Sequence, residues 1–228
     1  MPTLILSIFR VSWRHKGVIV LNFPNRLTDA AELHALLGEP NVLVANKVID
    51  HLDAHCLEFL AQSPFVVLST ADASGLCDVS PRGDQPGFVT VLDAKRLLIP
   101  ERPGNKRVDS LRNILSNPHI GLLFLIPGLE ETLRINGRAC IVRDEALLSG
   151  MAVQDRVPQL AIGVEVEECF VHCAKAFKRS QLWNPSTWAD KASLPSPAKM
   201  LAAHVKLPNI GEAEINAALQ ESYTKRLY

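Results

Sequence analysis

Short runs of β-branched and apolar residues, separated by turn residues, occupy the middle of the chain and constrain its fold more than any other feature. The first run, FVVLST at 65–70, leads into the turn residues DASG at 72–75, which is typical of a β-hairpin. Six or seven strands joined by short turns predict a mainly β fold with α decoration, most simply a barrel. The other strand candidates lie at 78–82, 88–93, 97–101, 119–127, 133–142 and 162–171.

Helix signals surround and interrupt these strands. Thr28-Asp29 is expected to cap a short helix that ends at Gly38, and a second helix is expected from about 45 to 62. Between the strands, 106–116 has the apolar spacing of a helix, and Asn117-Pro118 stops it. The predicted organisation is an N-terminal extension at 1–27, a helical lead-in at 28–62, a barrel at 63–185 and a C-terminal helical tail at 186–228, interrupted at Leu207-Pro208-Asn209.

Charge and cysteine content exclude several classes of partner and compartment. The 228 residues carry 24 basic and 24 acidic side chains, so a mainly electrostatic partner such as nucleic acid or an anionic membrane is not expected. No stretch approaches the roughly 18 apolar residues of a membrane span, and the basic centre of the N-terminal tract argues against a signal peptide. Five cysteines without framework spacing favour reduced thiols in a cytoplasmic protein.

The densest cluster of positive charge lies in ERPGNKRVDSLRNILSNP at 101–118. Arg102, Lys106 and Arg107 stand just before or at a predicted helix N-terminus, and Ser110 follows one turn later. Free N–H groups and the positive end of the helix dipole make such a terminus a good phosphate site. A solvated basic loop beside the barrel is the alternative.

Two weaker clusters flank this one. In SPRGDQPGF at 80–88, Arg82 lies at a predicted strand end before a tight turn, where it is either a ligand or a charged hairpin tip. In HCAKAFKRSQLW at 172–183, Lys175 and Arg179 lie near Trp183, which suits stacking on a planar ligand. A basic surface helix with Trp183 as its anchor explains the third cluster equally well.

No other catalytic or metal pattern stands out. His51 and His55 are spaced for one helical face with Asp53 between them, but no third ligand is near, so no metal is expected. The chain has no Walker loop, no Gly-x-Ser-x-Gly elbow and no Gly-x-Gly-x-x-Gly fingerprint. Phosphate binding without a dinucleotide fingerprint favours a mononucleotide.

The three clusters, in this order, resemble the pyridoxamine 5′-phosphate oxidase-like split barrels that bind flavin mononucleotide (FMN). The resemblance runs from Ser63 to about Pro185 and is closest to a bacterial subgroup of uncharacterised FMN-dependent flavoproteins. It is carried by SPF at 63–65, DVSPRGDQPGFV at 78–89, IPERPGNKRVDSLRNILSNP at 99–118, GLLFLIPG at 121–128, ETLRINGRA at 131–139 and HCAKAFKRSQLW at 172–183.

The resemblance implies a six-stranded antiparallel split barrel that forms a homodimer with two flavins at the subunit interface. It implies that the flavin phosphate is held by Arg82 and by the stretch that contains Asn105, Lys106, Arg107 and Ser110. It also implies that the partner subunit closes the pocket with a basic-aromatic segment, for which Lys175, Arg179 and Trp183 are the candidates.

The chain also departs from the vitamin-forming oxidases of this family. Asp84-Gln85 occupy the region where those enzymes carry a lysine, and their C-terminal arginine–tryptophan pattern is missing. The expected function is therefore a cytoplasmic FMN-dependent oxidoreductase acting on an unknown small substrate, with no catalytic residue assigned. The alternatives are a non-catalytic flavin carrier or sensor, or a deazaflavin- or haem-binding protein on the same barrel. Haem would require His119 or His172 as its axial ligand.

Overall fold

The computed structural model describes residues 24–228, which fall into two compact units that divide after Val42. In the first unit, helix α1 (Ala30–Leu37) follows Asp29, whose carboxylate accepts the N–H of Ala31 at 3.0 Å. The helix ends at Gly38, where φ is 76° and only glycine is unstrained. Both predicted ends of this helix are confirmed. The predicted extension at 1–27 lies, over residues 1–23, outside the described part of the chain.

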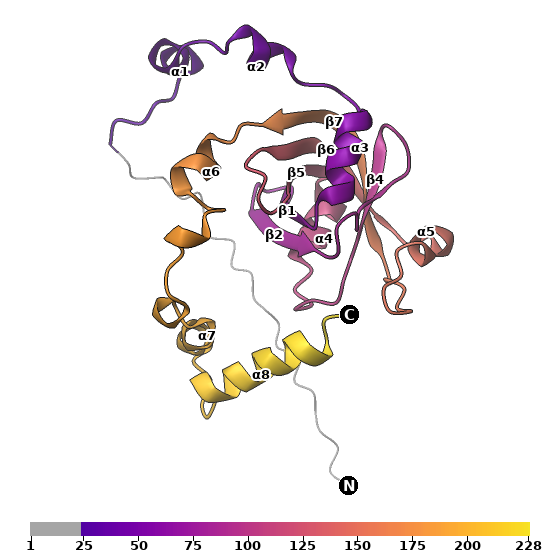
Figure 1. Ribbon diagram of the computed structural model, residues 1–228, viewed down its shortest axis with the longest axis vertical. Helices are drawn as coiled ribbons and strands as arrows, with labels where there is room; N and C mark the ends of the chain where they lie inside the picture. Colours follow the sequence, from indigo (N-terminus) through magenta and orange to yellow (C-terminus); the bar gives the residue numbers. More distant parts are fainter. Residues whose placement is uncertain (1–23) are drawn as a thin grey trace. The chain divides into compact units, whose positions relative to one another are not determined.

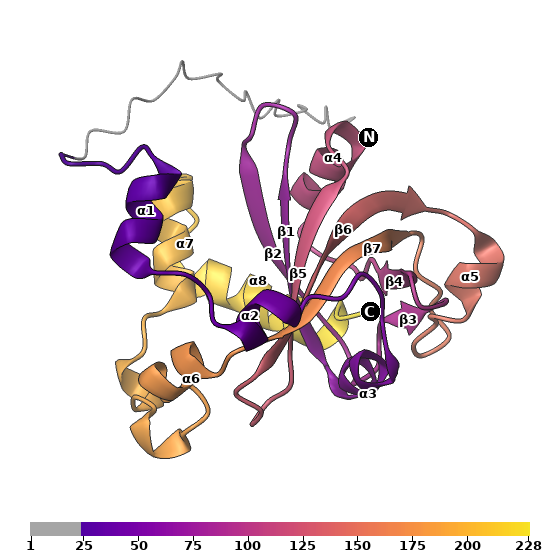
Figure 2. The same ribbon diagram turned by 90° about the horizontal axis from the view of Figure 1, so that it is seen from above.

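The second unit is built on one antiparallel sheet that curls around its core (Figure 2). The predicted mainly β antiparallel fold with added helices is confirmed, but the sheet has seven strands rather than six and is not a closed barrel. Its order is β2-β1-β5-β6-β7-β4-β3, with β2 and β3 as the edges. The strands are β1 (Phe65–Ala71), β2 (Cys77–Gly83), β3 (Thr90–Val91), β4 (Arg96–Pro100), β5 (His119–Leu125), β6 (Thr132–Val142) and β7 (Ala161–His172).

Alternation along the strands separates a buried face from an open one. In β1, Val66 and Leu68 are fully buried, whereas Phe65 and Ser69 are exposed. The register pairs Val66 with Phe124 and Leu68 with Leu122 on β5, so the apolar side chains of both strands meet on the same face. Helices α3 (Ala54–Gln62) and α4 (Asp109–Ser116) contribute further side chains to this core.

The predicted single helix at 45–62 is wrong. The chain forms α2 (Val42–Asn46) and α3, so the prediction holds only over α3, and the residues between the two helices are not helical. Ile49 pairs with Cys169 of β7 through main-chain hydrogen bonds of 3.0 and 2.7 Å. The carboxylate of Asp53 then accepts the N–H of Cys56 at 2.8 Å, which starts a new helix. Pairing with the sheet therefore overrides the helical spacing of 47–52.

The remaining helices follow the sheet in sequence. The interruption predicted at Leu207-Pro208-Asn209 is confirmed, because it separates two helices that pack against each other (Figure 1). In the part of the chain that is described, no helix is both long and apolar enough to cross a membrane. These elements are α5 (Glu145–Ser149), α6 (Lys175–Ser180), the 3-10 turns η1 (Pro185–Thr187) and η2 (Lys191–Ser193), α7 (Pro197–Val205) and α8 (Glu212–Lys225).

Gly137 marks the point where the long pair β6–β7 bends. The register shifts between Asn136 and Gly137, as in a β-bulge. A Cβ atom on Gly137 would overlap the carbonyl oxygen of Glu165 on β7. Glycine is therefore required here for the close approach of two backbones.

We expect Gly137→Ala to lower the free energy of unfolding by about 2–3 kcal/mol, because the new methyl group forces the two strands apart. Gly121→Ala is the matched control, since its Cβ would meet only ordinary contacts of 3.5 Å and 3.9 Å. Urea denaturation at neutral pH measures both. Equal stability of the two variants would contradict a steric requirement at Gly137.

Candidate functional site

The loop between β4 and α4 carries most of the predicted phosphate ligands. Lys106 and Val108 have φ of 60° and 54°, so the chain turns sharply before the helix begins at Asp109. The predicted helix start at Lys106 is therefore wrong by three residues. The left-handed conformations at Lys106 and Val108 are incompatible with a right-handed helix at these positions, so Val108 is the N-cap and its carbonyl accepts the N–H of Arg112 at 3.0 Å. Asn105 shapes the loop, because its side-chain oxygen accepts the N–H of Arg107 at 3.0 Å.

A cavity of about 520 Å³ lies between this loop and the end of β2; we call it the strand-side cavity. It contains three of the predicted cofactor ligands, Arg82, Arg102 and Asn105. Its lining is Ser80, Pro81, Arg82, Gly83, Asp84, Gln85, Phe88, Pro100, Arg102, Pro103, Gly104, Asn105, Leu227 and Tyr228.

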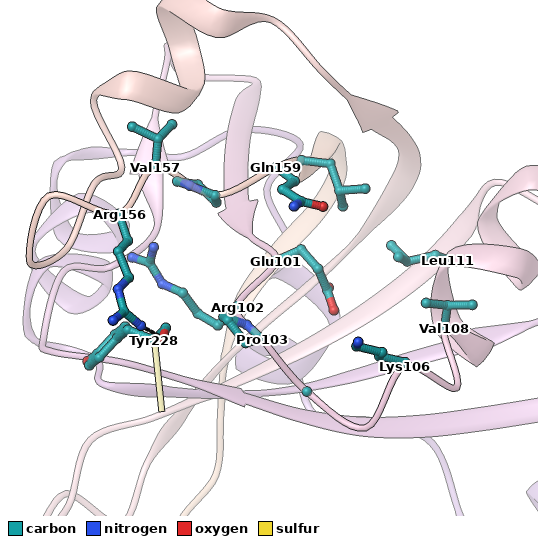
Figure 3. Close-up of a pocket in the computed structure, with 13 residues that line it drawn as sticks. Glu101, Arg102, Pro103, Lys106, Val108, Leu111, Arg156, Val157, Gln159 and Tyr228 are labelled. Carbon is teal, nitrogen blue, oxygen red and sulfur yellow. Dashed lines mark hydrogen bonds between the residues drawn. The ribbon is translucent and has the colours of Figure 1, made fainter. Parts of the chain in front are cut away.

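A second cavity, of about 500 Å³, lies on the other side of the loop, next to the start of α4 (Figure 3); we call it the helix-side cavity. Arg102, Pro103, Gly104 and Tyr228 line both cavities and so form their common wall. The helix-side lining is Glu101, Arg102, Pro103, Gly104, Lys106, Val108, Leu111, Arg156, Val157, Pro158, Gln159, Leu160 and Tyr228.

Two arginines of the site are held by carboxylates of the same chain. Arg82 donates from Nη1 to Glu101, and their side chains are 16% and 23% exposed. Arg102 donates from Nε to Asp84 at 2.6 Å, where the carboxylate is only 1% exposed. Among the described residues, Nε of Arg82 is a buried nitrogen with no hydrogen-bond partner. The site therefore contains a buried donor that its own ion pairs do not satisfy.

Asp84 is the most heavily hydrogen-bonded group of the site. Besides Arg102, it accepts the hydroxyl of Tyr228 at 2.7 Å and the N–H of Gln85 at 2.8 Å. Burial by itself raises the pKa of Asp84, but these three donors outweigh burial and hold the pKa below its ordinary value. Asp84 is therefore a fixed negative charge that orients Arg102.

Tyr228 connects distant parts of the site. Its ring lies beside the guanidinium of Arg102, 5.9 Å from the ring centroid, and its main-chain oxygen accepts from Nη1 of Arg156. Sequence reasoning missed Glu101, Arg156 and Tyr228, and it treated Asp84 only as a departure from the family. Asp84 and Tyr228 are 144 positions apart, and no local pattern connects them.

Of the other predicted phosphate ligands, Ser110 and Arg107 lie apart from the cavity linings, whereas Lys106 does not. Ser110 is 2% exposed and donates its hydroxyl to Asp78 at 2.5 Å, and Nε of Arg107 donates to Asp109 at 2.8 Å. Neither residue belongs to the lining of the two cavities. Lys106 lines the helix-side cavity and points into it (Figure 3).

Within one chain, the basic-aromatic segment at 172–183 also lies apart from the two cavities. Trp183 stacks on Phe177 at a centroid distance of 5.6 Å and donates from Nε1 to the carbonyl of Leu129 at 2.8 Å. Lys175 and Arg179 belong to α6, beside this aromatic pair. Neither cavity lining contains Lys175, Arg179 or Trp183. Within one subunit, the segment at 172–183 is therefore not brought together with Arg82 and the loop before α4.

The remaining side chains with chemical potential are histidines and thiols. Among the described residues, no group of three His, Cys, Asp or Glu side chains is suited to hold a metal ion. His51 contacts Asp50 at 2.9 Å, and His119 contacts Asn117 at 2.8 Å. The buried thiols of Cys56 and Cys169 are 3.3 Å apart. Burial raises the pKa of both thiols, so neither is a reactive thiolate.

Comparison with known proteins identifies the family. The family model described as pyridoxamine 5′-phosphate oxidase matches residues 52–173, more than half of the chain. No curated protein matches the sequence. The chain belongs to the pyridoxamine 5′-phosphate oxidase family. The matched region contains Arg82 and the loop before α4, and it ends before Lys175.

Solved structures with similar folds come from several bacteria. HupZ of Group A Streptococcus has 19% identity and a TM-score of 0.43, over 52% of this chain and 92% of that chain. An FMN-binding protein from Syntrophomonas wolfei has 9% identity and a TM-score of 0.41, over 53% and 88%. General Stress Protein 26 of Bacillus anthracis has 14% identity and a TM-score of 0.39, over 50% and 89%.

The contact with Asp84 should be visible in the titration of Tyr228. The hydrogen bond to Asp84 raises the pKa of the Tyr228 phenol. A raised folded-state pKa means that this contact stabilises the fold below the unfolded pKa of about 10 and is lost as pH rises through the folded value. Phenolate absorbance should therefore show a tyrosine that titrates above pH 10.

This high-pH component should vanish in Tyr228→Phe. The chain has two tyrosines, so Tyr223→Phe is the matched control and should keep the component. A Tyr228→Phe protein that still shows it would contradict the Asp84–Tyr228 hydrogen bond.

Proposed function

We propose that this protein binds FMN through its phosphate at the strand-side cavity and acts as a flavin-dependent oxidoreductase on a small organic substrate. The observation that carries the proposal is the buried Nε of Arg82, which has no partner among the described residues and lies in the cavity lining. A phosphate oxygen is a strong, charge-assisted acceptor for such a donor. Membership of the pyridoxamine 5′-phosphate oxidase family supports the same proposal.

The residues around the cavity suit a mononucleotide. Arg82, Arg102 and Asn105 would hold the phosphate from the strand side, and Lys106 would approach it across the loop. A volume of about 520 Å³ is in the range of small-molecule and cofactor sites. The chain has no dinucleotide fingerprint, which favours FMN over larger flavins.

The protein's own contribution is positioning and charge. When bound, FMN supplies the two-electron chemistry. Asp84 fixes the guanidinium of Arg102, and Glu101 holds that of Arg82, so both cations are oriented before a ligand arrives. Such preorganisation lowers the entropy that binding would otherwise cost.

Substitutions at the Arg82–Glu101 pair should have opposite effects on the flavin. Arg82→Ala removes a charge-assisted phosphate contact, and we expect FMN affinity to fall about ten- to hundredfold. Glu101→Gln removes a negative charge beside the phosphate and releases Arg82, so affinity should rise by on the order of threefold to tenfold. Quenching of flavin fluorescence measures both.

Arg143→Ala is the control for this pair, because Arg143 is exposed and lies outside both cavity linings. Its affinity should equal that of the parent protein. If Arg82→Ala and Glu101→Gln both retain FMN as tightly as Arg143→Ala, the phosphate site is elsewhere.

We further propose that the protein is a homodimer in which Lys175, Arg179 and Trp183 of one subunit approach the flavin of the other. An uncovered apolar strip on β1 and β2 supports association. The register pairs Val67 with Pro81 and Ser69 with Val79 on the face opposite the core. Val79 is 64% exposed and Phe65 is 37% exposed, so this strip of the sheet is accessible to a second subunit.

We expect Val79→Lys to weaken dimerisation by at least about tenfold, because a two-fold interface would carry the new charge twice. Val205→Lys, at an exposed position of α7, is the control and should leave assembly unchanged. Sedimentation velocity over a concentration series measures both. A parent protein that is monomeric throughout and still retains FMN would contradict the dimer.

A further inference from the structure

We propose that residues 226–228 form a strap that covers the strand-side cavity and is displaced when a phosphate-bearing ligand binds there. The identity of that ligand as FMN rests on the proposed function, whereas the strap itself rests on contacts within this chain. The observation that points to it is the position of Tyr228, which lines both cavities and contacts Asp84, Arg102 and Arg156 (Figure 3).

The strap lies against one of the arginines of the proposed phosphate site. Arg102 donates from Nε to Asp84 and from Nη1 to the main-chain oxygen of Met151 at 2.9 Å. A guanidinium has five N–H donors, so a phosphate would bind Arg102 through donors that these two contacts do not use. The ring of Tyr228 lies beside the same guanidinium, 5.9 Å from the ring centroid. A phosphate and this ring therefore compete for the space next to Arg102.

Leu227 extends the cover along the strand-side cavity. It belongs to the same lining as Arg82 and Asn105, and it is 60% exposed. An apolar side chain offers a phosphate no hydrogen bond, so Leu227 contributes nothing to holding this ligand. Departure of the strap would leave a more polar lining around the two predicted phosphate ligands.

The contacts that hold the strap are mainly polar. The hydroxyl of Tyr228 donates to Asp84 at 2.7 Å, and the main-chain oxygen of Tyr228 accepts from Nη1 of Arg156. The strap follows α8, a helix that is described along its whole length and has one buried residue, Ile215. Because little apolar surface is buried to retain this segment, a ligand with charge-assisted hydrogen bonds of its own can replace it.

Release of the strap leaves the orientation of Arg102 intact. Asp84 also accepts the N–H of Gln85 at 2.8 Å and Nε of Arg102 at 2.6 Å, so it keeps two donors when the hydroxyl of Tyr228 departs. The common wall of the two cavities loses Tyr228 at the same time. The strap therefore regulates access to the phosphate site without being needed to build it.

The test uses the two tyrosines of the chain, Tyr223 and Tyr228. Tyr223 is 59% exposed on α8, whereas the hydroxyl of Tyr228 is bonded to Asp84. The full-length protein labelled with 3-fluorotyrosine gives two fluorine-19 signals, which Tyr223→Phe and Tyr228→Phe assign. The labelled protein is titrated with FMN and, separately, with inorganic phosphate. We expect the signal of Tyr228 to move toward that of a solvent-exposed tyrosine as either probe saturates, and the signal of Tyr223 to stay.

Weakening the strap should strengthen ligand binding, because the docked strap lowers the fraction of molecules that can accept the ligand. Tyr228→Phe removes the hydroxyl that donates to Asp84, and FMN affinity should rise about threefold. Tyr228→Ala also removes the ring, and affinity should rise about tenfold. Tyr223→Phe is the matched control and should leave affinity unchanged. Unchanged or lower FMN affinity in both Tyr228 variants would overturn the strap, since Tyr228 would then be a permanent wall of the site.

Failure of the proposed cofactor would have a different signature. FMN binding that leaves the signal of Tyr228 in place keeps the flavin and overturns the strap. If neither the parent protein nor Tyr228→Ala binds FMN, but inorganic phosphate moves the signal of Tyr228, the strap is supported and the flavin is refuted. No response to either probe in the parent protein and in Tyr228→Ala would overturn both proposals.

Discussion

Gly137 allows the backbones of β6 and β7 to approach where their register shifts by one residue, and both the sheet and the site depend on that approach. β7 pairs with β6 on one side and with β4 on the other, so the path of β7 determines where β4 lies. The loop that leaves β4 carries Arg102, Asn105 and Lys106. A side chain at Gly137 would therefore disturb strand pairing at the centre of the sheet and, through β4, the position of the proposed phosphate ligands.

The net charge of the site is set by ion pairs between its arginines and carboxylates of the same chain. Arg82 and Arg102 are mostly buried, and a buried guanidinium is stable only when its charge is compensated. Glu101 and Asp84 provide that compensation, and the hydroxyl of Tyr228 completes the hydrogen bonding of Asp84. The arrangement leaves Nε of Arg82 as a donor without a partner among the described residues. The site is thus close to neutral overall yet retains a directed donor.

Local sequence patterns predicted the strands well, because alternating burial along a strand produces alternating apolar and polar residues in the sequence. Strands β1, β5, β6 and β7 lie where the apolar runs placed them, and the cap at Asp29 was readable from two residues. Predictions that required knowledge of distant partners were wrong. Residues 47–52 have helical spacing but contribute a bridge to β7, and 88–93 contribute a strand of only two residues. Helix α4 begins at Asp109 rather than at the predicted Lys106, because the loop takes left-handed conformations at Lys106 and Val108.

For the site, the sequence alone determined the cations, since Arg82 and the basic loop are visible as residue types beside turns and a helix start. It also determined the family, through an ordered set of short motifs. Only the tertiary structure decided which of these cations share a cavity, and it separated Ser110 and the segment at 175–183 from them. It alone brought Tyr228 to Asp84 across 144 positions, and Arg156 to Tyr228 across 72. Sequence patterns report the neighbours of a residue along the chain, whereas ion pairs and cavity walls depend on which strands and loops the fold brings together.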